Sequence, residues 1–435
     1  MLSISTRQQL DEREGALKMK TKLPAILALC FGLIVACGGR KEAVLDGHWR
    51  AAWASSGGEI PVDVFLRTNA TGGLEAEARN DAEVVKFSRV ERFGNNIDFF
   101  IDRYECVINV VLSDDGKSMS GHWSKQAGSP NEMSFSAVKG DLERFPKEAY
   151  PGLADKVPFT DVSGTWRLRF EGDDCDSVGL FHQEGERLTG TIRAIDGDFR
   201  YLEGIFRNGL LLLSSFNGTW VFLFKAEMDG TGTLHGLWAR GPKEPVKWMA
   251  VREEPDYPDP FNVTKLSNAE RRLRFRYPSA DDPQLFVSNE DSDLQGKPLL
   301  AAFLLTGCPN SHDSGALLSQ MYKEYHSRGL NMVLVFYELT KDVKLARERV
   351  QRFNQEHDLP CPGLFSLAMS KKEVGLEIPD FEKFYAWPTV VFFDSLGKVD
   401  CIQTGIDGPA TGEHHTHLVG EYRKRIEKLL LPQVD

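Results

Sequence analysis

A cysteine stands where an apolar segment gives way to polar residues. In the stretch FLLTGCPNSHD, residues 303–313, Cys308 follows a glycine and precedes Pro309. At the start of a helix, a cysteine faces unpaired backbone N–H groups and the positive end of the helix dipole, which favour the thiolate. Pro309 fits the first helical turn because its missing N–H is not needed there. The pattern therefore predicts a nucleophilic thiol that could attack disulfides.

Ser311 stands three residues after Cys308, where a dithiol redox protein has its second cysteine. In a dithiol mechanism the first thiolate forms a mixed disulfide with the substrate, and the second cysteine then releases it. With Ser311 this release has no local nucleophile, although the hydroxyl can donate a hydrogen bond to the thiolate. The chemistry that remains is monothiol: trapping a partner, isomerising a substrate through its own thiol, or resolution by an external thiol.

Two other kinds of cysteine chemistry are a distant resolving thiol and a single-cysteine peroxidase. Cys361 or Cys401 could serve as a distant resolving thiol. Peroxidase chemistry is disfavoured, because the peroxiredoxin pattern has threonine three residues and proline seven residues before the cysteine. This chain has Leu305 and Ala301 at those positions.

A metal site could pair Cys308 with His312, four residues further along. Two ligands are weak evidence, and a solvated or thiolate-tuning histidine is the simpler interpretation. The run EHHTH at 413–417 is typical of the polar start of a helix, with Thr411 as a candidate cap. The sequence therefore predicts neither a metal nor a cofactor.

Strands and helices that alternate after residue 269 must position these residues. Their order predicts a parallel sheet completed by an antiparallel hairpin, hence an α/β domain at 269–435. A linker rich in proline and acidic residues precedes it at 253–268. The expected strands are 297–305, 330–339, 388–394 and 398–405, and the expected helices are 314–329, 341–358 and 417–431.

The region before the linker has an all-β pattern that occurs twice. Short alternating segments separated by Gly, Asp and Asn fill 45–145 and 160–252. The first half contains Gly47-His48-Trp49 and, 74 residues later, Gly121-His122-Trp123; the second contains Gly164-Thr165-Trp166 and, 72 residues later, Gly236-Leu237-Trp238. We expect a duplicated barrel or sandwich.

The tryptophans of this repeat are expected to cover the ends of each half. A functional alternative is that the aromatic residues line a ligand pocket or a partner-binding face. In the second half these residues are Phe181, Tyr201, Phe206, Phe216, Trp220 and Phe224.

Three segments resemble the thioredoxin fold and, more narrowly, the TlpA-like disulfide reductases that bacteria tether to their envelope. They are GKPLLAAFLLTGCPNSHD at 296–313, FYAWPTVVFFD at 384–394 and GIDGPATGEHH at 405–415, within a resemblance that spans about 265–432. The resemblance implies a cis-proline at Pro388 that faces Cys308 and aligns a substrate chain.

It further implies that Trp387, Thr389 and Pro309 contact the substrate. The chain departs from the pattern at Gly307, where the family has tryptophan, and at Ser311.

The N-terminus predicts export. Lys20 and Lys22 precede an apolar run, the layout of a secretory signal that is short for a membrane span. The sequence IVACGG resembles the lipobox of bacterial lipoproteins and implies a lipid on Cys37, with 1–37 as the export segment. A plain signal peptide with an incidental cysteine, or a buried helix, is the alternative. Because the first 18 residues are polar, translation could start at Met19.

The net charge of −11 gives no reason to expect nucleic-acid binding. We therefore expect a lipid-anchored protein facing the periplasm or the cell exterior. In it Cys308 would exchange disulfides with protein thiols of the envelope, helped by Ser311 and Pro388. The second hypothesis is a redox-inactive binding or scaffold module on the same fold.

Overall fold

The computed structural model describes residues 43–125, 132–150, 160–268, 270 and 272–431. The predicted export segment, with Met19 and the lipobox Cys37, lies outside these residues. Residues 43–435 belong to one compact unit. Within the described residues, no helix is both long and apolar enough to cross a membrane.

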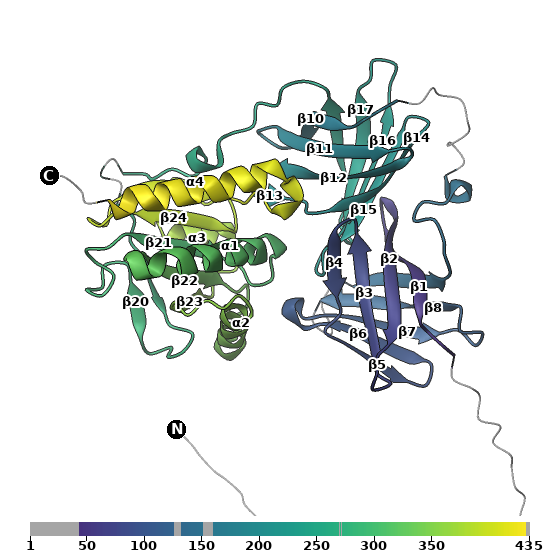
Figure 1. Ribbon diagram of the computed structural model, residues 1–435, viewed down its shortest axis with the longest axis horizontal. Helices are drawn as coiled ribbons and strands as arrows, with labels where there is room; N and C mark the ends of the chain where they lie inside the picture. Colours follow the sequence, from purple (N-terminus) through teal and green to yellow (C-terminus); the bar gives the residue numbers. More distant parts are fainter. Residues whose placement is uncertain (1–42, 126–131, 151–159, 269, 271, 432–435) are drawn as a thin grey trace, which may run out of the picture. The chain divides into compact units, whose positions relative to one another are not determined.

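The first β half closes into a barrel of eight antiparallel strands (Figure 1). Neighbours along the chain pair in turn, and β1 pairs with β9 to close the ring, while β4 pairs with β3 outside it. The strands are β1 (Gly47–Ser55), β2 (Gly58–Thr68), β3 (Leu74–Asn80), β4 (Glu83–Lys86), β5 (Arg89–Phe93), β6 (Asn96–Ile101), β7 (Cys106–Leu112), β8 (Ser118–Lys125) and β9 (Met133–Lys139).

The second β half repeats this barrel strand for strand. Its sheet order matches that of the first with every strand number raised by nine, and β13 again lies outside the ring. The predicted duplication is therefore confirmed, and its architecture is a barrel. The strands are β10 (Gly164–Phe170), β11 (Ser177–Glu184), β12 (Arg187–Ala194), β13 (Gly197–Asp198), β14 (Leu202–Arg207), β15 (Leu210–Phe216), β16 (Val221–Met228), β17 (Leu234–Arg240) and β18 (Val246–Val251).

The opening tryptophans of the repeat have the same role in both barrels. Trp49 in β1 and Trp166 in β10 are fully buried. Each indole N–H donates to a carbonyl four residues earlier, that of Leu45 at 2.8 Å and that of Val162 at 2.9 Å. A buried indole that pairs its one polar atom can close a barrel end at little cost.

The two barrels share a hydrophobic core. Phe216 at the end of β15 packs in the first barrel's core, with its ring 4.8 Å from that of Trp53. Asn80 of β3 fixes this contact, because its amide donates to the Phe216 carbonyl at 2.9 Å and its oxygen accepts the Phe216 N–H at 3.2 Å. The second barrel is thereby held in one register against the first.

The C-terminal region is a five-stranded mixed sheet in the order β23-β22-β21-β24-β25. The first three strands are parallel, and the last two form the predicted antiparallel hairpin. The strands are β21 (Leu299–Leu304), β22 (Asn331–Tyr337), β23 (Gly363–Ser366), β24 (Thr389–Phe393) and β25 (Val399–Thr404), and a separate hairpin consists of β19 (Arg276–Pro278) and β20 (Phe286–Ser288).

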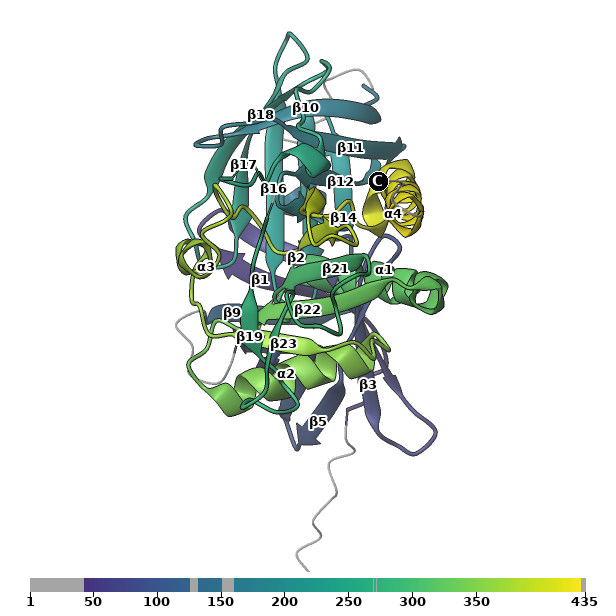
Figure 2. The same ribbon diagram turned by 90° about the vertical axis from the view of Figure 1, so that its left-hand side faces the viewer.

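Helices cover both faces of this sheet (Figures 1 and 2). Side chains of α1, α2 and α4 pack in one core, and those around α3 and β19 pack in a second core on the other face. This is the predicted α/β thioredoxin-like arrangement. The short elements β23 and α3 were not predicted. The helices are α1 (Pro309–Tyr325), α2 (Val343–Glu356), α3 (Lys371–Glu377) and α4 (Glu413–Leu430).

The start of α4 differs from the prediction. Gly412 occupies the N-cap, and the Thr411 hydroxyl donates instead to the carbonyl of Gly408 at 2.8 Å. Thr411 belongs to a short 3-10 turn, Pro409–Thr411, that precedes the helix. Its predicted role as a cap is therefore wrong.

Ion pairs, one buried and one half-buried, join the α/β region to both barrels. Arg193 of β12 donates two hydrogen bonds to the Asp407 carboxylate, at 2.7 and 2.9 Å. Arg349 of α2 does the same to Glu105 of the first barrel, at 2.8 and 2.6 Å. These bidentate contacts fix both distance and orientation. They bring one end of each barrel next to the start of α1, where Cys308 lies.

Candidate functional site

Cys308 is the N-cap residue of α1, directly after the loop that leaves β21. Its carbonyl accepts the first helical hydrogen bonds, from the N–H of Ser311 at 3.0 Å and from that of His312 at 3.3 Å. Pro309 occupies the first helical position. The local sequence thus forms the predicted geometry, with the thiol at the positive end of a 17-residue helix.

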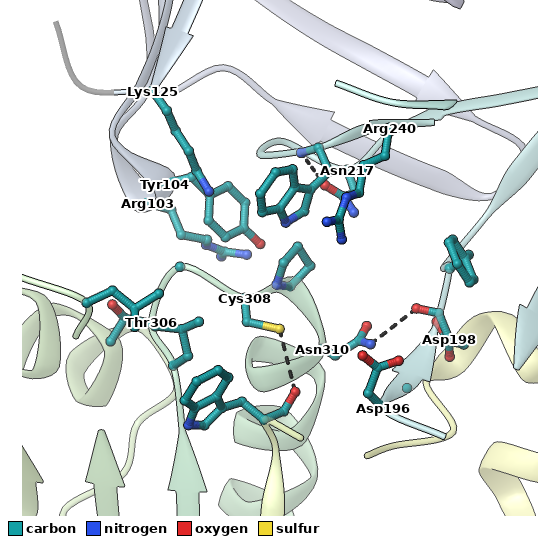
Figure 3. Close-up of a pocket in the computed structure, with 18 of the residues that line it drawn as sticks. Arg103, Tyr104, Lys125, Asp196, Asp198, Asn217, Arg240, Thr306, Cys308 and Asn310 are labelled. Atoms are coloured by element: carbon teal, nitrogen blue, oxygen red, sulfur yellow. Dashed lines mark hydrogen bonds between the residues drawn. The ribbon is translucent and has the colours of Figure 1, made fainter. Parts of the chain in front are cut away.

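The sulfur lies beside the loop before β24 (Figure 3). Its Sγ is 3.8 Å from the carbonyl oxygen of Trp387, toward which the thiol donates. The Trp387–Pro388 peptide bond is cis. The structure therefore brings together Cys308, Pro309, Trp387 and Pro388, which the sequence placed in one site.

The electrostatic environment of the thiol differs from the sequence-based expectation. Burial raises the pKa of Cys308 above its ordinary value, and this outweighs the backbone N–H groups of Ser311 and Asn310 and the Ser311 hydroxyl, which lower it. The residue keeps part of its surface exposed, but other atoms surround its sulfur densely. The site therefore favours the thiol over the thiolate.

The side chains of Ser311 and Thr389 face inward. Ser311 is fully buried, and its hydroxyl accepts the N–H of Leu305 at 3.1 Å. Thr389 is also fully buried and donates to the carbonyl of Ala386 at 2.8 Å. The Ser311 hydroxyl is also close enough to Cys308 to lower the pKa of its thiol. A substrate contact by the Thr389 side chain stays a prediction.

The remaining described cysteines are free thiols that do not line this site. Cys361 and Cys401 are buried in the core beneath α1, and burial raises the pKa of each to about 12. Neither lines the cavity that contains Cys308. Cys106 and Cys175, one in each barrel, are also unpaired. The structure therefore provides no resolving thiol beside Cys308 among the described residues.

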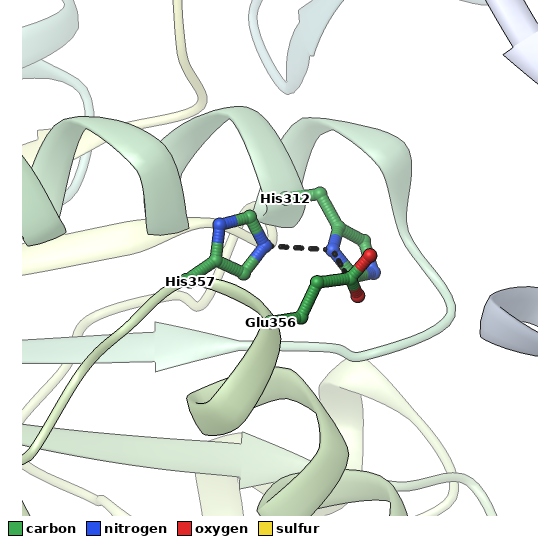
Figure 4. Close-up of side chains that lie close together, drawn as sticks. All are labelled: His312, Glu356 and His357. Carbon is green, nitrogen blue, oxygen red and sulfur yellow. Dashed lines mark hydrogen bonds and ion pairs between the residues drawn. The ribbon is translucent and has the colours of Figure 1, made fainter.

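His312 is buried and contacts another histidine rather than Cys308 (Figure 4). Its Nε2 donates to the Thr306 carbonyl at 2.9 Å, and its Nδ1 lies 2.9 Å from Nε2 of His357. Burial lowers the pKa of both histidines, so both are neutral at pH 7. Glu356 completes a group of possible ligands but pairs with Arg103. The Cys308–His312 metal pair considered from the sequence therefore does not form.

A cavity of about 630 Å³ opens above Cys308, between the α/β region and the barrels. The α/β side supplies Cys308, Pro309 and Trp387. Figure 3 shows side chains that reach into this space from the barrel side. They include Tyr104, Lys125, Asn217, Trp220, Trp238 and Arg240.

Of these barrel residues, sequence reasoning named only Trp220 as a candidate ligand contact. The other named aromatic residues, except the half-buried Tyr201, are buried in the barrel cores. The repeat did contain a signal for the two cations. Lys125 and Arg240 each follow the closing tryptophan of their half by two residues. The duplicated strands β8 and β17 therefore end with a cation at the same place.

The β12–β13 hairpin forms one wall of the site. The carbonyl of Asp198 accepts a hydrogen bond from the Asn310 amide at 3.2 Å. A Cβ added at Gly197 would lie 2.0 Å from that amide nitrogen, so the backbone touches α1 directly. A Cβ at Gly405 would lie 2.8 Å from the Ile195 carbonyl. The hairpin thus fills the groove between the start of α1 and the loop after β25.

A buried carboxyl fixes this hairpin. Asp198 accepts the backbone N–H of Arg200 at 2.7 Å and that of Gly408. Burial, followed by the negative charge of Asp313, raises the pKa of Asp198 to about 7. Its protonation state therefore changes near neutral pH.

The chain was compared with known proteins. No family model and no curated protein matches it. Among solved structures, it is similar to a thiol:disulfide interchange protein of the thioredoxin family from Chlorobium tepidum, at 16% identity, over 38% of this chain and 99% of that one, with a TM-score of 0.29. A thiol-disulfide oxidoreductase from Bacteroides fragilis matches at 18% identity, over 37% of this chain and 98% of that one, with a TM-score of 0.27.

A secreted disulfide oxidoreductase from Mycobacterium tuberculosis matches at 16% identity, over 36% of this chain and 96% of that one, with a TM-score of 0.26. These partial similarities accompany the strand order described above, which carries the fold assignment. The C-terminal region is a thioredoxin-like domain.

The raised pKa of Cys308 predicts slow alkylation at neutral pH. We expect its rate with iodoacetamide to lie below that of a free cysteine at pH 7, and to keep rising above pH 8.5, about where an ordinary thiol titrates. Mass spectrometry assigns the site, and Cys308→Ser measures the contribution of the half-buried Cys175. A rate that levels off near pH 7 would show that the helix N-terminus outweighs burial.

The raised pKa of Asp198 predicts a pH dependence of stability. The folded state binds this proton up to about pH 7, whereas an unfolded aspartate releases it near pH 4. Stability should therefore fall as pH rises from about 4 to 7, by at most about 1.4 kcal/mol per pH unit. Urea unfolding from pH 5 to 8 should show a shallower decline for Asp198→Asn than for the unchanged chain. Parallel declines would contradict this assignment.

Proposed function

We propose that this protein acts in thiol–disulfide exchange through the single cysteine Cys308. The observation that carries the proposal is the position of Sγ at the N-cap of α1, 3.8 Å from the carbonyl that precedes Pro388, in the wall of an open cavity. A sulfur in such a cavity can be reached by a disulfide. The loop before Pro388 then places the Trp387 carbonyl beside the bound disulfide.

The exchange is written with one bond formed and one broken. The Cys308 thiol loses its proton to solvent, and the thiolate attacks a disulfide R–S–S–R′. A bond from Cys308 to the RS sulfur forms, the S–S bond breaks, and R′S⁻ leaves and takes up a proton. The attacked disulfide is the oxidant, so no cofactor is required.

This site is suited to capture rather than to turnover. Burial raises the pKa of Cys308, and a thiol of high pKa is a poor leaving group from a mixed disulfide. Ser311 cannot displace it, and none of the other described cysteines lines the cavity. A mixed disulfide on Cys308 therefore persists until an external thiol resolves it.

A second candidate function is a redox-inactive binding module. The raised thiol pKa and the donation from Sγ to the Trp387 carbonyl favour it, because both stabilise the unreactive form. In this alternative the cavity binds its ligand without covalent chemistry. The stoichiometry described below distinguishes the two.

The proposal includes the cellular location. Export and lipid attachment are supported by the basic residues, the apolar run and the lipobox-like IVACGG that contains Cys37. The domains would then meet protein thiols and disulfides of the cell envelope, an oxidising compartment in which such exchange occurs.

Restoring the second cysteine should convert capture into release. With excess 5,5′-dithiobis(2-nitrobenzoate), the unchanged chain should release one equivalent of thionitrobenzoate from Cys308 and keep the other half bound. Ser311→Cys should release two, because the new thiol displaces the bound half. Cys308→Ser gives the background of the other cysteines. If the unchanged chain releases nothing above that background, the binding module remains.

Lipid attachment at Cys37 can be tested in cells that process bacterial lipoproteins. Labelled palmitate should enter the full chain, and Cys37→Ser should abolish the label and move the protein from the membrane fraction to the soluble one. Cys30→Ser is the matched control, since it changes a cysteine of the same segment and should keep the label. Equal labelling of the Cys37→Ser variant would exclude the lipobox.

A further inference from the structure

The barrel side of the cavity carries two cations that approach the same indole. The ammonium of Lys125 lies 4.2 Å from the ring centre of Trp220, and the guanidinium carbon of Arg240 lies 5.2 Å from it. Arg240 also lies 5.5 Å from the ring centre of Trp238. Figure 3 shows both side chains extending from the barrels toward the space above Cys308.

The other cations that line the cavity are neutralised by carboxylates. Arg349 pairs with Glu105, and Arg103 pairs with Glu356. Lys371 has Asp196 at 3.9 Å. These pairs leave no net positive charge on their own part of the wall.

Lys125 and Arg240 have no such partner within ion-pair distance among the described residues. The carboxylates that influence them, Glu105 for Lys125 and Asp196 for Arg240, act from farther away and belong to the pairs above. Burial lowers the pKa of both cations, as expected for charges held partly out of water without a counter-ion. An anion in the cavity would restore the missing attraction in a region of low dielectric.

One of these cations also acts on the thiol. Lys125 interacts electrostatically with Cys308. An anion held by Lys125 and Arg240 would therefore lie within the same electrostatic environment as the sulfur. Recognition of an anionic sulfur compound requires a thiol and unneutralised cations. Both are found in this one cavity.

The size of the site favours a small molecule over a polypeptide. The backbone at Gly197 already touches Asn310, and the Ile195 carbonyl lies against Gly405. An extended chain has no free groove beside the start of α1. A cavity of about 630 Å³, in contrast, falls within the usual range of small-molecule pockets.

We propose that the cavity binds small anionic thiols and their disulfides, with the anionic group held by Lys125 and Arg240 and the sulfur at Cys308. This inference rests on the proposed exchange at Cys308 and specifies its substrate class. The covalent step is the one given above, with a small disulfide as oxidant. One half joins Cys308, and the other half leaves as a thiolate and is protonated.

The test compares two small disulfides that differ in charge, using the full chain in detergent. One is 5,5′-dithiobis(2-nitrobenzoate), which carries two carboxylates, and the other is the uncharged 4,4′-dithiodipyridine. Both release chromophores, so the rate at Cys308 is measured directly after subtraction of the Cys308→Ser background.

Removing either cation should slow the anionic reagent more than the neutral one. We expect Lys125→Gln and Arg240→Gln each to lower the ratio of the anionic rate to the neutral rate about tenfold; a change in the ionisation of Cys308 slows both reagents alike and cancels in this ratio. This corresponds to the loss of one charge contact in a partly desolvated site. Lys125→Arg keeps the charge and should keep the rate. Arg274→Gln, on the exposed surface, is the matched control, and thermal melting confirms that each variant folds.

The outcomes separate this inference from the proposed function. If both reagents react and neither cation variant discriminates between them, the anionic substrate class is wrong while exchange at Cys308 stands. If neither reagent reacts at Cys308, exchange itself fails. High salt should slow the anionic reagent more than the neutral one, and an equal response to salt would count against the inference.

Discussion

The environment of Cys308 depends on how the β12–β13 hairpin packs against the thioredoxin-like domain. Arg193 holds the hairpin to Asp407 through two buried hydrogen bonds, and Asp198 holds it to the N–H of Gly408. Buried ion pairs add little net stability because desolvation offsets their attraction, but they define a particular geometry. Here that geometry places barrel residues over a position that would otherwise face solvent.

Two opposing effects then act on the thiol, and their magnitudes decide the outcome. A helix N-terminus stabilises a negative charge by about 0.3–1 kcal/mol, or up to about 2 kcal/mol in partly buried sites. Burial can shift a pKa by as much as about 3–5 units, and each unit corresponds to about 1.4 kcal/mol. The helix dipole is therefore too weak to keep Cys308 ionised once the barrels cover it.

Much of the fold was predictable, because it depends on local patterns. The alternation of apolar and polar residues gave the two β halves, the repeated Gly-x-Trp motifs gave their duplication, and the order of strands and helices gave the C-terminal domain. The short elements β23 and α3 were missed because four to seven residues carry too little periodicity. Thr411 was misassigned because Gly412, one residue later, takes the cap.

The site was only half predictable. The geometry of a helix start identified Cys308 and Pro309, and the resemblance to the thioredoxin fold identified Pro388. The raised pKa of Cys308 arises from burial, and segments more than 100 positions away in the chain pack against the start of α1, as the contact of Asn310 with Asp198 shows. No single-sequence pattern reports such a contact. Lys125 and Arg240 gave a signal only in retrospect, through their equivalent places in the repeat.

The duplication also explains why the cavity has unneutralised cations. Equivalent loops, before β7 and before β16, approach Cys308 from the two barrels, and they have diverged. The first uses Glu105 to bind Arg349 and places Tyr104 against His312, with ring centres 5.5 Å apart. The second supplies Trp220, which has no carboxylate to offer. One copy of the loop therefore anchors the thioredoxin-like domain. The other copy leaves Lys125 and Arg240 facing an indole. This arrangement costs stability unless an anion occupies the cavity.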